Sequence, residues 1–251
     1  MSLTEHRVAR YSAALREGGS LPALVETEAG ETVVAKWRGA GQGAAALVAE
    51  VIVGELARAV GLPMPGLCTL QLDAVIARNE RDQEIRDLLI ASDGLNLGMQ
   101  YLRGALNYDP AAGMPVSPEL ATRIVVFDTF ATNVDRTPRN PNLMWWSGGL
   151  WLIDHGASLY WHHGWDGTVE RTDRPFPMVR DHVLLPLVAD VQRHGRPLLD
   201  GLTDAVIANA VEQVPAAWLP APASAYVAFL SSRRSAADRL LREVEDARAA
   251  V

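Results

Sequence analysis

Three side chains near the middle of the chain have the types and spacing of a phosphotransferase catalytic centre: Asp135, Asn140 and Asp154. A kinase catalytic loop needs a carboxylate that accepts the proton of the substrate hydroxyl, an amide oxygen for a metal ion, and a second aspartate that bridges metal and phosphates. In such loops the amide follows the first carboxylate after about five residues, as it does here. This spacing predicts Asp135 as the catalytic base and Asn140 and Asp154 as metal ligands.

The residues between Asn140 and Asp154 predict how these two come together. Residues 142–153 form two apolar runs around a Ser-Gly-Gly turn, which is typical of a short β-hairpin. Such a hairpin returns Asp154 to the side of Asn140. Asp, Arg, Pro and Asn also build ordinary turns, so the first half of the motif alone would indicate a loop. The spacing, the hairpin and the Asp-His-Gly sequence at its exit together favour the catalytic interpretation.

The first hundred residues carry the patterns of a small sheet packed on one helix. The expected elements are a hairpin over Leu21–Trp37, a helix over Ala44–Val60, strands at Leu67–Leu72 and Leu95–Leu102, and a charged helical segment at Asp82–Ser92. After this part, the pattern becomes helical. The expected helical segments are Pro118–Ala131, Asp181–His194, Pro197–Gln213 and Ala225–Ala249. This order predicts an α+β, bilobal fold, with an N-lobe at 1–102, a C-lobe at 103–251 and a boundary near Leu102–Ala112.

A nucleotide between two such lobes needs a cation at its phosphates, and Lys36 at the end of the hairpin is the candidate. The following helix should supply an acid that holds this lysine. On a helical wheel, Glu55 and Arg58 lie together and resemble a solvated i, i+3 pair. Glu50 instead has apolar neighbours, where a carboxylate is unfavourable unless it is paired. Glu50 is therefore the predicted partner of Lys36.

Two further segments could contact a nucleotide. The glycines before Ser20 would let backbone N–H groups approach phosphate oxygens, so Gly19 and Ser20 are candidate phosphate contacts. The tripeptide Gly18-Gly19-Ser20 is also typical of a flexible linker. The apolar segment Leu97–Leu102 reaches the expected crossing between the lobes, where its backbone could hydrogen-bond adenine or simply pack.

The composition narrows the partners and the compartment. The net charge of −7 comes from mixed acids and bases without a Lys/Arg stripe, so neither nucleic acid nor an anionic membrane surface is expected as a main partner. Cys68 lies in an apolar run and is expected to be a buried, inert thiol. The N-terminal residues lack the apolar core of a signal peptide, and charges interrupt each apolar stretch. A soluble cytoplasmic protein is predicted.

The order of these motifs resembles the HipA-like kinases, relatives of the protein-kinase and phosphatidylinositol-kinase fold. The resemblance covers roughly residues 18–165, and it is strongest in Asn133–Asn140 and Leu152–Gly156. The segment from Ala49-Glu50 to Gly61-Leu62-Pro63 also resembles the helix and helix exit of that family.

This resemblance implies a protein-kinase-like fold, an ATP- and Mg²⁺-dependent activity, and a role for each matched residue. It implies that Lys36 holds the phosphates, Glu50 anchors Lys36, Met99 lines the adenine pocket, Gln100 and Leu102 offer backbone groups, Asp135 is the base, and Asn140 and Asp154 hold Mg²⁺. The acceptor would be a hydroxyl group of a protein, such as Ser or Thr, or of a small molecule.

The sequence departs from the HipA toxins at two points. Those toxins are longer and carry an N-terminal subdomain that meets their antitoxin, whereas only twenty residues precede the first predicted strand here. This puts an antitoxin-type partner in doubt. Arg136 follows the catalytic aspartate as in lipid-kinase loops, which leaves the acceptor open.

Three other functions compete with the kinase interpretation. The segment Gly39–Ala44 fits the G-x-G-x-x-G/A fingerprint of a dinucleotide-binding oxidoreductase. His155, His162, His163 and Asp166 could form a metallohydrolase site, although the adjacent histidines lack the i, i+4 spacing of a helical metal site. A pseudokinase that binds nucleotide without turnover would carry the same motifs.

Overall fold

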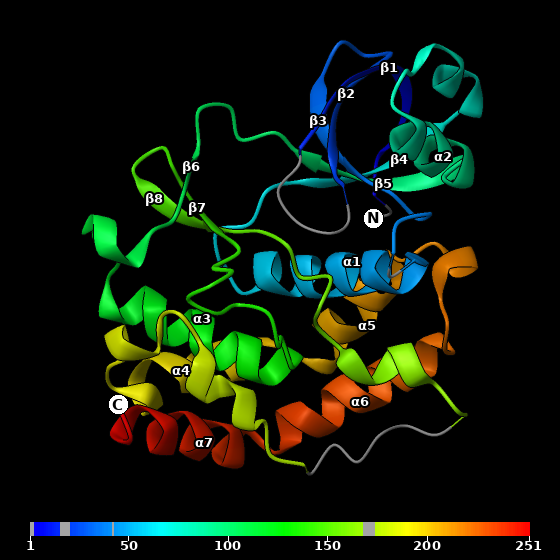
Figure 1. Cartoon of the computed structure of the whole chain (residues 1–251). Coiled ribbons are helices and arrows are strands. Elements are labelled where there is room, and N and C mark those ends of the chain that lie inside the picture. The colour runs from blue at the N-terminus through cyan, green and yellow to red at the C-terminus, as the bar shows by residue number, and fades with distance from the viewer. Residues whose placement is uncertain (1–2, 16–20, 42, 168–173) are drawn as a thin grey trace. The chain divides into compact units, whose positions relative to one another are not determined.

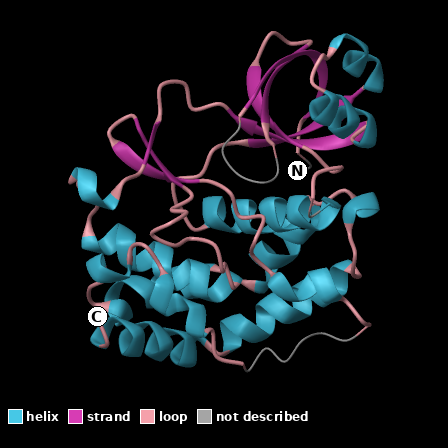
Figure 2. Cartoon of the chain, in the orientation of Figure 1, coloured by secondary structure: helices cyan, strands magenta, loops and turns pink. Residues whose placement is uncertain are grey.

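The computed structural model describes residues 3–15, 21–41, 43–167 and 174–251 of the chain (Figure 1). It divides into two compact units. The first contains Met1–Val48 and Pro65–Arg103, and the second contains Ala49–Met64 and Gly104–Val251. Helix α1 (Gly43–Ala59) contributes to both units. Strands dominate the first unit and helices dominate the second (Figure 2).

Within the described residues, five strands of the first unit form a closed barrel in the order β1-β2-β3-β5-β4. They are β1 (Glu5–Ala14), β2 (Ala23–Thr27), β3 (Thr32–Lys36), β4 (Leu67–Leu72) and β5 (Gly94–Gln100). Strands β1 and β4 run parallel, and the other neighbours are antiparallel. The predicted hairpin is confirmed by β2 and β3, and the two later predicted strands are confirmed by β4 and β5.

Strand β1 is a correction, because the sequence patterns predict no strand before Leu21. Val8 is the one buried residue of this strand, so it lacks the apolar alternation that marks a half-buried strand. Pairing with both β2 and β4 holds it in the barrel. The doubt about an antitoxin-type partner was based on the number of residues before the first predicted strand, and β1 lies within those residues.

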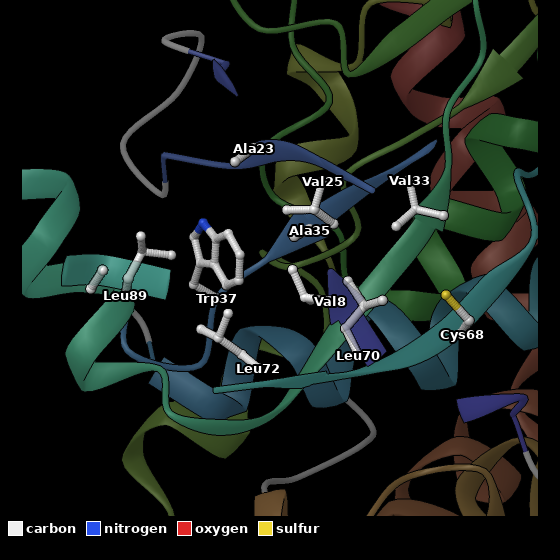
Figure 3. Close-up of a cluster of buried hydrophobic side chains, with 11 residues drawn as sticks. Val8, Ala23, Val25, Val33, Ala35, Trp37, Cys68, Leu70, Leu72 and Leu89 are labelled. Carbon is white, nitrogen blue, oxygen red and sulfur yellow. The ribbon is translucent and has the colours of Figure 1, made fainter. Parts of the chain in front are cut away.

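The apolar core of the first unit fills the barrel (Figure 3). Trp37 lies at one end of this core with Leu72 and with Leu89 of helix α2 (Gln83–Ala91), and Cys68 lies towards the other end. Burial raises the pKa of the Cys68 thiol to about 11, so the thiol is protonated at neutral pH. This agrees with the predicted buried and inert cysteine.

The barrel geometry argues against the dinucleotide-binding fingerprint at Gly39–Ala44. That fingerprint follows a strand of a parallel sheet, whereas β3 lies between antiparallel neighbours. A Cβ atom at Gly39 would lie 2.8 Å from both the Cβ of Ala91 and the Oγ of Ser92. The N–H of Gly39 donates to that Oγ at 3.2 Å. Gly39 therefore allows close packing against the end of α2.

The second unit contains the C-terminal part of α1, the long helices, short 3-10 turns and a small sheet. The later helices are α3 (Pro118–Ala131), α4 (Val191–Gly201), α5 (Asp204–Glu212), α6 (Ala223–Ser235) and α7 (Ala237–Ala249). The sheet contains β6 (Leu106–Asn107), β7 (Leu143–Trp146) and β8 (Gly149–Leu152), and the turns include η3 (Tyr160–Gly164), η4 (Pro177–Asp181) and η5 (Leu185–Leu187). None of the helices in the described part of the chain has the length and apolarity needed to cross a membrane.

Helix α3 is the central helix of this unit and agrees with the prediction in both bounds. The Ser117 hydroxyl accepts the N–H of Leu120 at 3.1 Å, and Pro118 takes the first turn, where a missing N–H is tolerated. From Ala121 onward nearly every residue of α3 is buried. Contacts with α4, α6 and α7 account for this burial. The predicted catalytic loop therefore starts from a fixed helix end.

The later helices differ from the prediction. The segment 181–194 is not one helix, because two 3-10 turns precede α4, which begins at Val191 after the N-cap Asp190. Pro186 within this stretch has no N–H for a helical hydrogen bond. The expected segment 197–213 is split between α4 and α5, and 225–249 is split at Ala236.

Candidate active site

The end of α3 sets the position of the predicted catalytic loop. Thr132 turns the chain out of the helix with a left-handed backbone (φ 53°). The side chain of Asn133 then connects helix and loop: its Nδ2 donates to Asp128 Oδ1 at 3.1 Å, and its Oδ1 accepts the N–H of Asp135 at 3.1 Å. Asn133 thus fixes the backbone of the predicted base.

The carboxylate of Asp135 is oriented by two amides. Its Oδ2 accepts Nδ2 of Asn140 at 2.8 Å and Nδ2 of Asn142 at 3.2 Å. Among the described residues, none donates to its Oδ1. One oxygen is therefore held in place while the other can accept a proton. Asn140 lies beside Asp135, but Asn142 is a contact that the sequence patterns did not predict.

The predicted hairpin is present and returns Asp154 to the catalytic loop. Strands β7 and β8 pair Leu143 with Leu152, and Ser147 and Gly148 make the turn with positive φ angles of 50° and 78°. The pairing continues one step further, where the N–H of Ile153 donates to the carbonyl of Asn142 at 3.1 Å. Asp154 follows directly, with a left-handed backbone (φ 54°) that aspartate adopts more readily than most residues.

Arg136 joins the two halves of the motif from inside the protein. Its side chain has 0% exposure. Its Nη1 donates to the carbonyls of Asn142 and, at 3.3 Å, Ile153, and its Nη2 contacts Nδ1 of His155 at 3.2 Å. One guanidinium therefore holds the residues on both sides of Asp154 while its backbone follows Asp135. The side chain that resembled a lipid-kinase feature belongs to this scaffold and is enclosed by it.

Asp128 is the counter-charge of Arg136. Its Oδ2 lies 2.5 Å from Nε of Arg136 and 3.0 Å from Nε2 of His182. Burial alone would raise the pKa of this carboxyl, but Arg136 and the hydrogen bond from His182 outweigh it and hold the pKa well below its usual range. The N–H of Leu184 donates to Nδ1 of His182 at 3.1 Å, so the neutral ring carries its proton on Nε2.

The donor set suits Mg²⁺ or Mn²⁺. The predicted ligands Asn140 and Asp154 offer only amide and carboxylate oxygens, which hard divalent cations prefer. Because Asn140 donates its Nδ2 to Asp135, its Oδ1 points the other way, and no described residue donates to that oxygen. This amide oxygen remains available as a ligand.

The histidines of the metallohydrolase alternative are engaged in other contacts. His162 contacts the Tyr226 hydroxyl through Nδ1 at 3.0 Å, and burial lowers its pKa to about 3. His155 contacts Arg136. In the described part of the chain, no group of three or more His, Cys, Asp or Glu side chains could hold a metal ion.

A family model described as HipA-like kinase matches residues 8–247, nearly the whole chain. The chain belongs to the HipA-like kinase family. No curated protein matches it.

Three solved structures that resemble this HipA-like kinase are also kinases, at low sequence identity. A Golgi casein kinase matches with a TM-score of 0.58 and 9% identity, over 96% of this chain and 75% of that chain. A Golgi casein kinase with Mn/ADP bound matches with a TM-score of 0.59 and 10% identity, over 96% of this chain and 74% of that chain. The proinflammatory kinase CtkA of Helicobacter pylori matches with a TM-score of 0.58 and 10% identity, over 98% of each chain. These matches show the fold and confirm the predicted kinase-like α+β class.

The predicted nucleotide contacts of the first unit lie at the end of β3 and along β5. Lys36 is paired in register with Leu97, and Met99 is buried. The backbone N–H of Gln100 donates to the carbonyl of Gly66 at 2.8 Å. This N–H is therefore not available to an adenine base. The backbone of buried Leu102 makes no hydrogen bond with other described residues. Gly19 and Ser20 lie outside the described residues.

Helix α1 distinguishes its two acids as predicted. Glu50 has 1% exposure. Glu55 is 24% exposed at its side chain and lies 3.7 Å from Arg58, the i, i+3 pair expected from the helical wheel. Glu50 and Lys36 belong to different units, so their pairing stays a prediction.

This difference supplies a matched test of Glu50. Glu50→Gln is expected to lower phosphoryl transfer by about 10²-fold and keep the fold, because a neutral amide no longer fixes the ammonium of Lys36 at the phosphates. Glu55→Gln should change little, since exposed ion pairs contribute only about 0–1 kcal/mol. Phosphoryl transfer, or ATP turnover, is measured for both variants and the wild type. Equal losses of phosphoryl transfer in the two variants would show that Glu50 is not the partner of Lys36.

Proposed function

We propose that this HipA-like kinase transfers the γ-phosphoryl group of ATP, with Mg²⁺, to a hydroxyl group of a protein or a small molecule. The observation that carries this proposal is the catalytic loop. Asp135 has one oxygen held by Asn140 and Asn142 and the other able to accept a proton, and Arg136 ties this loop to the residues flanking Asp154.

The proposed chemistry is an in-line displacement with Asp135 as base. The acceptor hydroxyl donates its proton to Oδ1 of Asp135 as the hydroxyl oxygen forms a bond to the γ-phosphorus, and the bond from that phosphorus to the leaving oxygen of ADP breaks. Mg²⁺, when bound, would neutralise negative charge on the phosphates. Asn140 and Asp154 are the proposed ligands, and the Mn/ADP complex of the Golgi casein kinase supports use of a divalent ion.

The first unit is proposed to hold the nucleotide. Lys36 would contact the phosphates, anchored by Glu50. Met99 would line the adenine pocket, and Leu102 together with the carbonyl of Gln100 would offer backbone hydrogen bonds to the base. The cytoplasmic location expected from the sequence stays a prediction.

Selective stabilisation by nucleotide tests the proposal. ATP with Mg²⁺ at about 100 times its dissociation constant should stabilise the native state by about 2.7 kcal/mol. For a chain of this length, this corresponds to a rise of about 5–10 °C in melting temperature. NAD should give no rise. A rise with NAD but none with ATP would overturn the kinase proposal, and a rise with ATP but no ADP production with any acceptor would assign the chain as a pseudokinase.

A further inference from the structure

The carboxylate of Asp128 holds the predicted catalytic loop on both sides of Asp135. Its Oδ1 accepts Nδ2 of Asn133 at 3.1 Å, and the Oδ1 of Asn133 accepts the N–H of Asp135 at 3.1 Å. Its Oδ2 accepts Nε of Arg136, the residue that follows Asp135. Asp128 belongs to α3 and is 0% exposed. The orientation of this one carboxylate therefore determines where the backbone of the predicted base lies.

A third donor to Asp128 comes from a distant part of the chain. His182 directly follows η4, and its Nε2 donates to Oδ2 of Asp128 at 3.0 Å. The backbone of His182 is fixed on both sides: its N–H donates to the carbonyl of Val179 at 3.2 Å, and its carbonyl accepts the N–H of Leu185 at 3.0 Å. The N–H of Leu184 donates to Nδ1 of the ring. Both ring nitrogens are therefore bonded, and the imidazole has one orientation.

The segment that carries His182 also contacts the loop through its backbone. The N–H of Val183 donates to the carbonyl of Arg136 at 3.0 Å. After η5, the N–H of Ala189 donates to the hydroxyl of Thr122 on α3 at 2.9 Å, and Thr122 is buried. Two consecutive residues of this segment thus hold Asp128 and Arg136, and a third fixes the segment to the helix that carries Asp128.

We propose that His182 is a positioning residue for the base Asp135. This inference rests on the proposed function, in which Asp135 accepts the proton of the acceptor hydroxyl. His182 acts through Asp128: by donating to Oδ2 it keeps that carboxylate directed at Asn133 and Arg136, which fix the backbone on both sides of Asp135. Hydrogen bonds to a buried carboxylate are strong. A displacement of a catalytic group by about 1 Å can lower the rate by about 10²-fold.

Two substitutions of His182 separate its hydrogen bond to Asp128 from its bulk. ADP production from ATP and Mg²⁺ is measured, with water as the acceptor. His182→Leu retains the bulk without a donor and should lower kcat at least tenfold, with the KM for ATP within threefold of the wild type. His182→Gln has an amide group that can donate to Asp128, and its kcat should return to within threefold of the wild type. Equal losses in these two variants would overturn the proposal.

A control and a double variant distinguish positioning of the base from general destabilisation. Tyr226→Phe removes the hydroxyl that contacts another buried histidine, His162, at 3.0 Å, and should keep kcat within twofold of the wild type. In Asp135→Asn there is no base left to position. Single-turnover transfer by Asp135→Asn/His182→Leu should therefore stay within twofold of Asp135→Asn alone. If the losses of the two single variants multiplied instead, His182 would not act through the base, and the proposal would be refuted.

Amide hydrogen exchange tests the position of the base without catalysis. The N–H of Asp135 donates to the side chain of Asn133, so its exchange rate reports whether the loop keeps its place. His182→Leu should raise this rate at least tenfold, whereas His182→Gln and Tyr226→Phe should stay within threefold of the wild type. An unchanged rate in His182→Leu would contradict the proposal. If the wild type produced no ADP with any acceptor, the proposed function would fail instead, and the exchange rates alone would decide whether His182 fixes this loop.

Discussion

Asp135→Asn is expected to reduce phosphoryl transfer by about 10²–10⁴-fold, the usual contribution of a general base, and to leave nucleotide affinity nearly unchanged. The amide has the shape of the carboxylate, and its oxygen can still accept the hydrogen bonds from Asn140 and Asn142. In place of Oδ1, however, the asparagine has an NH2 group, which cannot accept the proton of the acceptor hydroxyl. The affected step is therefore proton acceptance, and single-turnover transfer at saturating ATP measures it directly.

Asp154→Asn is the matched comparison, because it changes the same functional group at the proposed metal ligand. It should weaken nucleotide binding in the presence of Mg²⁺ and have little effect on binding without the metal. Calorimetric titration of both variants, with and without Mg²⁺, separates the two roles. Loss of nucleotide binding in Asp135→Asn together with full activity in Asp154→Asn would reverse the assignment.

The parts of the fold that sequence patterns predicted are those set by local signals. Helix α3 has a capping serine, a proline in its first turn and a long apolar run, so its bounds followed from the sequence. The hairpin of β7 and β8 has a turn whose residues tolerate positive φ. These two elements position Asp135 and Asp154, and therefore the placement of both residues of the predicted catalytic motif followed from local sequence signals.

The parts that were missed depend on contacts distant in sequence. Strand β1 exposes most of its residues and is held by partners on both sides. Asp128 reads as one polar residue in an apolar helix, and His182 lies 54 positions away. No local pattern connects them. Asn142 lies directly before β7, which is a local signal for a position beside the loop, but the five-residue spacing from Asp135 predicts Asn140 alone.

Arg136→Met is expected to destabilise the protein by about 3–5 kcal/mol, because it leaves the carboxylate of Asp128 buried without its cation. The second variant Asp128→Asn/Arg136→Met removes that charge and should recover part of the loss. Arg196→Met is the control: Arg196 pairs with Asp238, whose side chain is 73% exposed, and such pairs contribute only about 0–1 kcal/mol. Denaturant unfolding at pH 7 gives the three values.

The pH dependence of Arg136→Met identifies the cause of its instability. In the wild type the pKa of folded Asp128 lies below its unfolded value of about 3.9. The contribution of Asp128 to the free energy of unfolding is therefore complete above about pH 4 and lost as the pH falls through the folded pKa.

Without Arg136, burial should dominate and the Asp128–His182 pair should take up a proton above pH 4. The folded state then binds more protons than before, so the free energy of unfolding of Arg136→Met relative to wild type should rise from pH 7 towards pH 4.5. The double variant should lose this relative slope, whereas a constant difference in all three proteins would show that Arg136 stabilises the loop through packing and not through its charge.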